Sequence, residues 1–163
     1  MIFGFSPAVF FHVVISLVGI FTGFVVLFGW LGGKSQPGWT AAFLLTTVAT
    51  SVTGFFLPAN GFMPSHAVGI ISLVALAVAL YALYSRKMAG GWRPTYLITA
   101  TAAQYFNVFV LVAQLFAKVP ALKALAPTQS EPPFAIAQGL VLLAFLALGF
   151  LAVKRYRTDS PAA

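Results

Sequence analysis

Apolar residues fill five long stretches of the chain, and no Asp, Glu, Lys or Arg interrupts any of them. The stretches cover residues 8–31, 40–57, 65–85, 95–117 and 134–153. Each contains about the 17–25 residues that an α-helix needs to cross the hydrocarbon core of a bilayer. The pattern therefore predicts an all-α, polytopic membrane protein, with five transmembrane helices in a single domain over residues 1–163.

Turn-forming residues separate the five stretches. Gly, Pro or Asn cluster in segments 32–38, 58–61 and 89–91, as is typical of connections between helices. The longest connection, 118–133, contains four prolines. Proline restricts the residue before it to extended conformations, so we expect an extended or turn-rich cap over one end of the bundle.

The overall composition agrees with a lipid environment. The chain is 61% hydrophobic and 7% charged, whereas about a quarter of the residues of a soluble domain are charged. This excludes a water-soluble domain. The chain also lacks cysteine, which excludes disulfides and thiolate metal sites.

Basic residues are distributed unequally between the two ends of the predicted bundle. One end receives Lys34, Arg86, Lys87, Arg93, Lys154, Arg155 and Arg157, and the other receives only Lys118 and Lys123. The positive-inside rule then predicts that the N-terminus is outside and the C-terminus is cytoplasmic. No basic stripe or soluble module is present, so we expect no nucleic-acid partner.

Polar residues within the stretches recur on single helical faces. The sets are His12, Ser16, Gly19 and Gly23; Thr47, Ser51 and Gly54; Gln104, Asn107, Leu111, Gln114 and Lys118; and Gln138, Leu142, Phe145 and Gly149. Polar and small residues in membrane helices turn inward and pack against other helices. The helical rise places His12, His66, Gln114 and Gln138, together with Asn60, in the outer half of the bundle. We therefore predict a polar cluster under the outer cap.

The cluster has two interpretations. In the first, the amides, hydroxyls and His12 form structural hydrogen bonds between helices. In the second, His12 and His66 are the axial iron ligands of a haem b, whose propionates pair with Lys118 and Lys123. A quinone pocket at the same place requires only histidine and amide donors, such as Gln114 and Gln138, beside apolar walls.

The sequence lacks the residues that other kinds of functional site would require. A two-histidine metal site has no third ligand, because Glu131 is the sole carboxylate on that side. The spans contain no Asp or Glu, which argues against a carboxylate proton relay or a cation-coupled carrier. Nucleotide-binding and hydrolase motifs are absent from the sequence.

We therefore expect a non-enzymatic accessory or scaffold subunit, whose glycine-lined faces pack against a second copy or a membrane-complex partner. The alternative is a haem- or quinone-binding electron-transfer protein with its site in the outer leaflet half. A small carrier or channel ranks third, because no charged lining exists for one.

Two segments carry a resemblance to a known group of proteins. They are TGFFLPANGFMP at 53–64 and KVPALKALAPTQSEPPF at 118–134. With these segments the chain resembles a family of small, uncharacterised bacterial multi-pass membrane proteins over its whole length. The resemblance implies a bacterial inner membrane, and because the family has no known activity it implies no functional residue.

Overall fold

The computed structural model describes residues 6–58, 61 and 63–157, and within these ranges every regular element is helical. The elements are α1 (Pro7–Leu31), α2 (Pro37–Gly54), α3 (Pro64–Leu80), a π-helical turn η1 (Tyr81–Ser85) that continues α3, α4 (Trp92–Lys118), α5 (Pro120–Leu125) and α6 (Pro132–Arg155). The expectation of an all-α fold is confirmed. Asn60 lies outside the described residues.

Proline sets the start of most helices. It occupies the first turn of α1, α2, α3, α5 and α6. Its fixed φ suits the first helical turn, and its missing N–H would have no partner there. This explains why α1, α2, α3 and α6 begin one to three residues before the apolar stretches that predicted them.

One predicted boundary requires correction, and one connection contains more helix than expected. Helix α2 ends at Gly54, so residues 55–57 of the stretch 40–57 form a turn instead of a helical end. The connection 118–133, expected to be extended or turn-rich, contains a turn at 127–128 and also the short helix α5. Pro120 favours the extended conformation of Val119 before it, but it also starts the helical turn after it.

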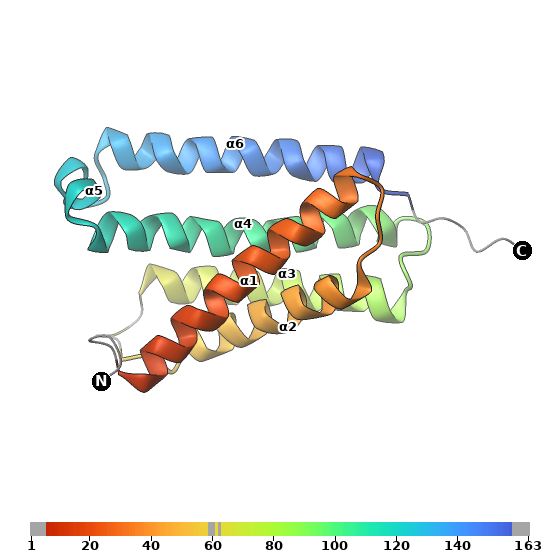
Figure 1. The fold of residues 1–163 in the computed structure, drawn as a ribbon, viewed down its shortest axis with the longest axis horizontal. Helices are drawn as coiled ribbons and strands as arrows, with labels where there is room; N and C mark the ends of the chain where they lie inside the picture. Colours follow the sequence, from red (N-terminus) through yellow and green to blue (C-terminus); the bar gives the residue numbers. More distant parts are fainter. Residues whose placement is uncertain (1–5, 59–60, 62, 158–163) are drawn as a thin grey trace, which may run out of the picture.

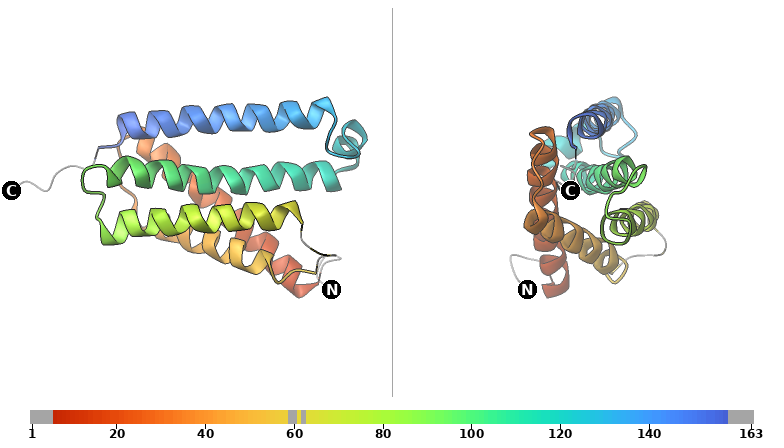
Figure 2. Two further views of the ribbon diagram at one scale, coloured as in Figure 1. Left: turned by 180° about the vertical axis from the view of Figure 1, so that it is seen from behind. Right: turned by 90° about the vertical axis from the view of Figure 1, so that its right-hand side faces the viewer.

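The helices form two layers. Helices α3, α4 and α6 lie side by side in one layer, and α1 and α2 form the other (Figure 1, Figure 2). Helix α1 crosses the first layer diagonally, from beside α2 at its start toward α6 at its end (Figure 1). The beginning of α1 and the end of α6 lie at opposite ends of the bundle.

Two glycines determine how closely α1 can approach its neighbours. A Cβ atom on Gly19 would lie 3.2 Å from Thr46 Oγ1, and one on Gly23 would lie 2.3 Å from Gln104 Oε1. A side chain at Gly23 would therefore occupy the place of the Gln104 amide. The predicted inward face of α1 packs in this way inside the chain, against α2 and α4.

A buried polar network connects the two layers at this crossing. Gln104 is fully buried, and its Nε2 donates to the Ile20 carbonyl of α1 at 2.7 Å. Asn107 Nδ2 donates to Thr47 Oγ1 of α2 at 3.1 Å and lies 3.4 Å from Gln104 Oε1. Buried amides are costly unless they are paired, so this network fixes the relative positions of α1, α2 and α4.

Aromatic residues and one arginine pack together at the end of the bundle that lies opposite the start of α1. The centroid of the Trp30 ring lies 5.4 Å from that of the Tyr96 ring and 6.1 Å from that of the Tyr156 ring. Arg93 Nη1 donates to the backbone carbonyls of Val153 and Tyr156. These contacts hold the end of α1, the start of α4 and the end of α6 together.

Within the described part of the chain, four helical segments are long and apolar enough to cross a membrane. They are Pro7–Leu31, Pro64–Ser85, Trp92–Lys118 and Pro132–Arg155. Large apolar side chains on their outer surfaces are exposed, for example Phe21 and Leu143. Such a surface suits contact with lipid. Helix α2 is not one of these four segments. It is shorter, and six of its 18 residues are Thr or Ser, which lowers its mean hydropathy.

Candidate functional site: the histidine cavity

A cavity of about 370 Å³ lies among α1, α2, α3 and α4. Its polar lining residues are His12, Ser16, Thr50, Ser51, Ser65, His66, Ser72, Asn107, Gln114 and Lys118. Most of the remaining wall is aliphatic or aromatic, including Val13, Leu17, Phe55, Phe106, Val110 and Leu111. We call it the histidine cavity. It brings four predicted site residues together: His12, His66, Gln114 and Lys118.

The cavity results from the diagonal course of α1. Helices α1 and α4 approach closely where Gly23 faces Gln104, and they diverge toward the start of α1 (Figure 1). The histidine cavity occupies the widening space. Leu17 and Leu115 line it from α1 and α4 while remaining 51% and 40% exposed. The cavity therefore reaches the apolar outer surface of the bundle between these two helices.

His12 is held by α2. Its Nδ1 lies 2.8 Å from Thr53 Oγ1, and the Thr53 hydroxyl donates its own proton to the Ala49 carbonyl at 2.7 Å. We assign the Thr53 proton to the Ala49 carbonyl, and with that assignment the hydroxyl oxygen accepts from His12 and the ring proton lies on Nδ1. Nε2 then carries a lone pair. Within residues 6–58, 61 and 63–157, no hydrogen-bond partner contacts that nitrogen.

His66 has the opposite arrangement. The backbone N–H of Met63 donates to His66 Nδ1 at 2.9 Å, so the proton of the neutral ring is on Nε2. The His66 ring also stacks on Phe55, with centroids 5.6 Å apart and planes 17° apart. Residues at the C-terminal end of α2 thus contact both histidines. Thr53 contacts His12, and Phe55, which follows Gly54, contacts His66.

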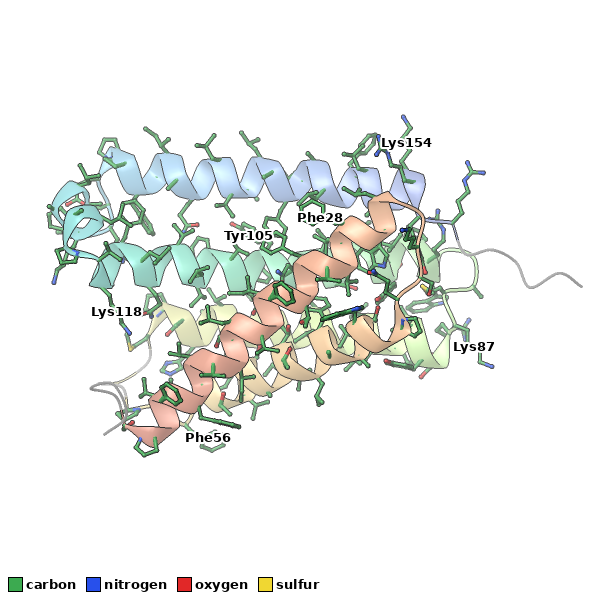
Figure 3. The ribbon with its side chains drawn as sticks, in the orientation of Figure 1. Phe28, Phe56, Lys87, Tyr105, Lys118 and Lys154 are labelled. Carbon is green, nitrogen blue, oxygen red and sulfur yellow. The ribbon has the colours of Figure 1, made fainter. Side chains whose placement is uncertain are left out.

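The other predicted residues differ in their positions. Gln114 and Lys118 are exposed and lie at the rim of the cavity, and Figure 3 places Lys118 at the end of the bundle opposite Lys87 and Lys154. Gln138 is buried elsewhere, where its Nε2 donates to the Phe109 carbonyl of α4 at 3.0 Å. The rotation of α6 directs that amide into the contact between α4 and α6, so Gln138 does not line the cavity.

Three residues of the site were not anticipated from the sequence. Thr53 and Phe55 position the histidines, and Thr50 contributes a buried hydroxyl oxygen that has no partner among the described residues. Threonine in a membrane helix usually bonds to its own backbone, so its identity alone indicates no site. The pairing of α2 with α1 reveals the role of Thr53, and the contact of Phe55 with His66 of α3 reveals that of Phe55.

The proton positions argue against a haem held by both histidines. Axial ligation requires an unprotonated ring nitrogen directed at the iron. His12 could provide Nε2, but the His66 Nδ1 lone pair is engaged by the Met63 N–H and its Nε2 is protonated. The residues therefore do not fit a bis-histidine haem. No group of three or more His, Cys, Asp or Glu residues that could hold a metal ion occurs in the described part of the chain.

Comparisons with known proteins do not assign a family. No protein-family model matches the chain, and no curated protein or solved structure is significantly similar to it.

Proposed function

We propose that the chain is a five-helix protein of a bacterial inner membrane that binds a small lipophilic molecule in the histidine cavity. The single observation that carries the proposal is the combination of apolar walls open to the lipid-facing surface with a histidine that Thr53 holds and whose Nε2 has no partner among the described residues. Ligand sites typically combine apolar walls with a few placed polar groups, at volumes of roughly 300–1,000 Å³.

Five crossings follow if α2 spans the membrane beside α1. Its 18 residues give a length of about 27 Å, close to the thickness of a hydrocarbon core. The positive-inside rule then supports an outer N-terminus, because seven basic residues fall at one end of the bundle and two at the other. In this orientation the histidine cavity lies in the outer leaflet half.

The hydrogen bonding of polar groups in the cavity wall is evidence for a bound molecule. Elsewhere in the bundle, the Gln104 amide is paired, whereas Gln138 Oε1 and Thr101 Oγ1 are buried without a partner among the described residues. In the histidine cavity, Thr50 Oγ1 is buried and unpaired, and His12 Nε2 is unpartnered. An unpaired polar group in an apolar environment is costly, and a bound group that donates to His12 Nε2 would remove that cost.

An accessory subunit is the second candidate. The glycines at the α1 crossing are used inside the chain, but a Cβ atom on Gly139 of α6 would meet open space. Its neighbours Ile136, Leu140 and Leu143 are more than 60% exposed. A helix of a second copy or a partner could approach there. Finding only monomers, with no partner, after purification in mild detergent would contradict this second role.

The test of ligand binding is chemical extraction of the purified protein. The wild-type chain, Val110→Trp and Leu143→Trp are purified in mild detergent, and bound lipophiles are identified by chromatography and mass spectrometry. Trp at 110 fills the histidine cavity, whereas Trp at 143 faces outward. We expect one lipophile to be retained by the wild type and Leu143→Trp and lost from Val110→Trp. Val13→Phe, a smaller cavity-filling change, serves if the first variant does not fold. Equal lipid content in all folded variants would refute the proposal.

A further inference from the structure

We propose that the lipophile is a hydroxylated ring lipid of the quinol class, and that its hydroxyl donates to His12 Nε2. This inference rests on the proposed function. It specifies the chemistry of the ligand from the hydrogen-bond assignment of His12 and Thr53 beside the histidine cavity.

The first step is the identity of the missing partner. With the Thr53 hydroxyl proton assigned to the Ala49 carbonyl 2.7 Å away, His12 Nδ1 donates to Thr53 Oγ1. The Nε2 of this tautomer can only accept a hydrogen bond. The ligand group that meets it must therefore carry a proton, as a hydroxyl does and as a ketone or an ionised carboxylate does not.

The second step is the shape of the ligand. The wall includes two phenylalanines, Phe55 and Phe106, and Phe55 stacks with the His66 ring. Flat aromatic surfaces favour a planar ring over a flexible acyl chain. The exposed side chains of Leu17 and Leu115 mark where the cavity opens between α1 and α4, so an isoprenoid tail can leave toward the acyl chains of the bilayer.

The third step is the role of Thr53 as a positioning residue. It does not line the cavity, but it fixes which His12 nitrogen carries the proton. Without its hydroxyl the ring can place the proton on Nε2, and the site would then offer a donor to the ligand. Thr53 should therefore determine whether the cavity prefers the quinol or the quinone form.

The experiment compares the binding of a short-chain benzoquinone and its quinol. Both are titrated under anaerobic conditions into the full chain in lipid nanodiscs, and dissociation constants are measured by calorimetry. We expect the wild type to bind the quinol about fivefold more tightly, the effect of one additional hydrogen bond. His12→Phe should abolish the preference. Thr53→Val should abolish or reverse it while preserving binding. Thr99→Val is the matched control, because the Thr99 hydroxyl bonds only within α4.

The outcomes separate the two proposals. Equal binding of both forms in the wild type, with binding lost in Val110→Trp, would overturn the quinol assignment and leave the lipophile site intact. A preference that survives Thr53→Val would overturn the role of Thr53. Tighter binding of oleate than of either ring compound would also overturn the assignment. If no ring compound binds and the purified protein yields no lipophile on extraction, the proposed function fails as well.

Discussion

Gly23 of α1 lies directly against the Gln104 amide of α4, so that a Cβ atom at position 23 would come within 2.3 Å of Gln104 Oε1. The amide could not move aside without losing its hydrogen bond to the Ile20 carbonyl. This contact lets α1 and α4 lie close together at their crossing. The separation of the two helices beyond it creates the histidine cavity.

We therefore expect Gly23→Ala to destabilise the protein by about 1–3 kcal/mol, through overpacking and the loss of a buried hydrogen bond. Gly139→Ala is the matched control, because a Cβ atom there meets open space and should change stability little. Thermal unfolding of both variants in detergent provides the measurement. Equal melting temperatures would mean that the Gly23 contact does not limit the approach of the helices.

The His12 ring should be found as the Nδ1–H tautomer in the membrane. Solid-state ¹⁵N NMR of histidine-labelled protein distinguishes the two ring nitrogens by their chemical shifts. Because Thr53 accepts the Nδ1 proton at 2.8 Å, Thr53→Val should add signal from the other tautomer. His66→Gln assigns the two sets of signals. An Nε2–H signal for His12 in the wild type would contradict the hydrogen-bonding scheme at α2.

Asn107 and Thr47 should be energetically coupled, because they share a hydrogen bond between α4 and α2. Asn107 Nδ2 donates to Thr47 Oγ1 at 3.1 Å between α4 and α2. Hydrogen bonds between membrane helices contribute about 0.6 kcal/mol on average. A double-mutant cycle of Thr47→Val and Asn107→Leu, measured by unfolding, should give a coupling energy near that value. Strict additivity of the two changes would show that this bond does not join the layers.

Glu131 should make stability depend on pH in the acid range. Desolvation tends to raise the pKa of its carboxyl group. This effect is outweighed by hydrogen bonds from the Thr128 hydroxyl and from the N–H groups of Thr128 and Ser130, which lower the pKa below its ordinary value of 4.5. A carboxyl group whose pKa is lower in the folded state stabilises that state above the unfolded pKa, and the contribution is lost as pH falls through the folded value. The melting temperature should therefore fall below pH 4.5, and Glu131→Gln should reduce that fall. An identical acid profile for the variant would exclude this role.

The orientation can be tested cleanly because the natural chain contains no cysteine. Single cysteines are introduced as Lys123→Cys in α5 and Lys87→Cys between η1 and α4. With the N-terminus outside, a membrane-impermeant maleimide should label only Lys123→Cys in intact cells and both variants in lysed cells. Labelling of Lys87→Cys alone in intact cells would reverse the orientation. Labelling of both would indicate an even number of crossings between them.

Much of the fold could be predicted from the sequence because lipid imposes simple rules on it. Long apolar stretches must be helical to satisfy their backbone hydrogen bonds, and the spacing of His12, Gly19 and Gly23 correctly indicated the inward face of α1. The cavity could be anticipated only in part. His12 and His66 do line one cavity. The predicted depth of Gln138 did not show that its side chain points toward α4 and away from this cavity.

The details that govern chemistry depend on tertiary contacts. The proton position on His12 is set by Thr53, 41 residues away along the chain, and no pattern within either helix indicates that pairing. The short helix α5 arises because Pro120 both ends α4 and begins a new turn, which composition alone does not distinguish from an extended loop.

Photo-crosslinking at the cavity wall tests the central claim most directly, because it locates a ligand in the intact membrane. A photoreactive phenylalanine analogue replaces Leu111, which lines the histidine cavity, or Leu143, which faces outward. After illumination of whole cells, mass spectrometry identifies what is attached to the chain. We predict a single ring-lipid adduct at position 111 and only phospholipid at position 143. The same phospholipid adducts at both positions would contradict the account.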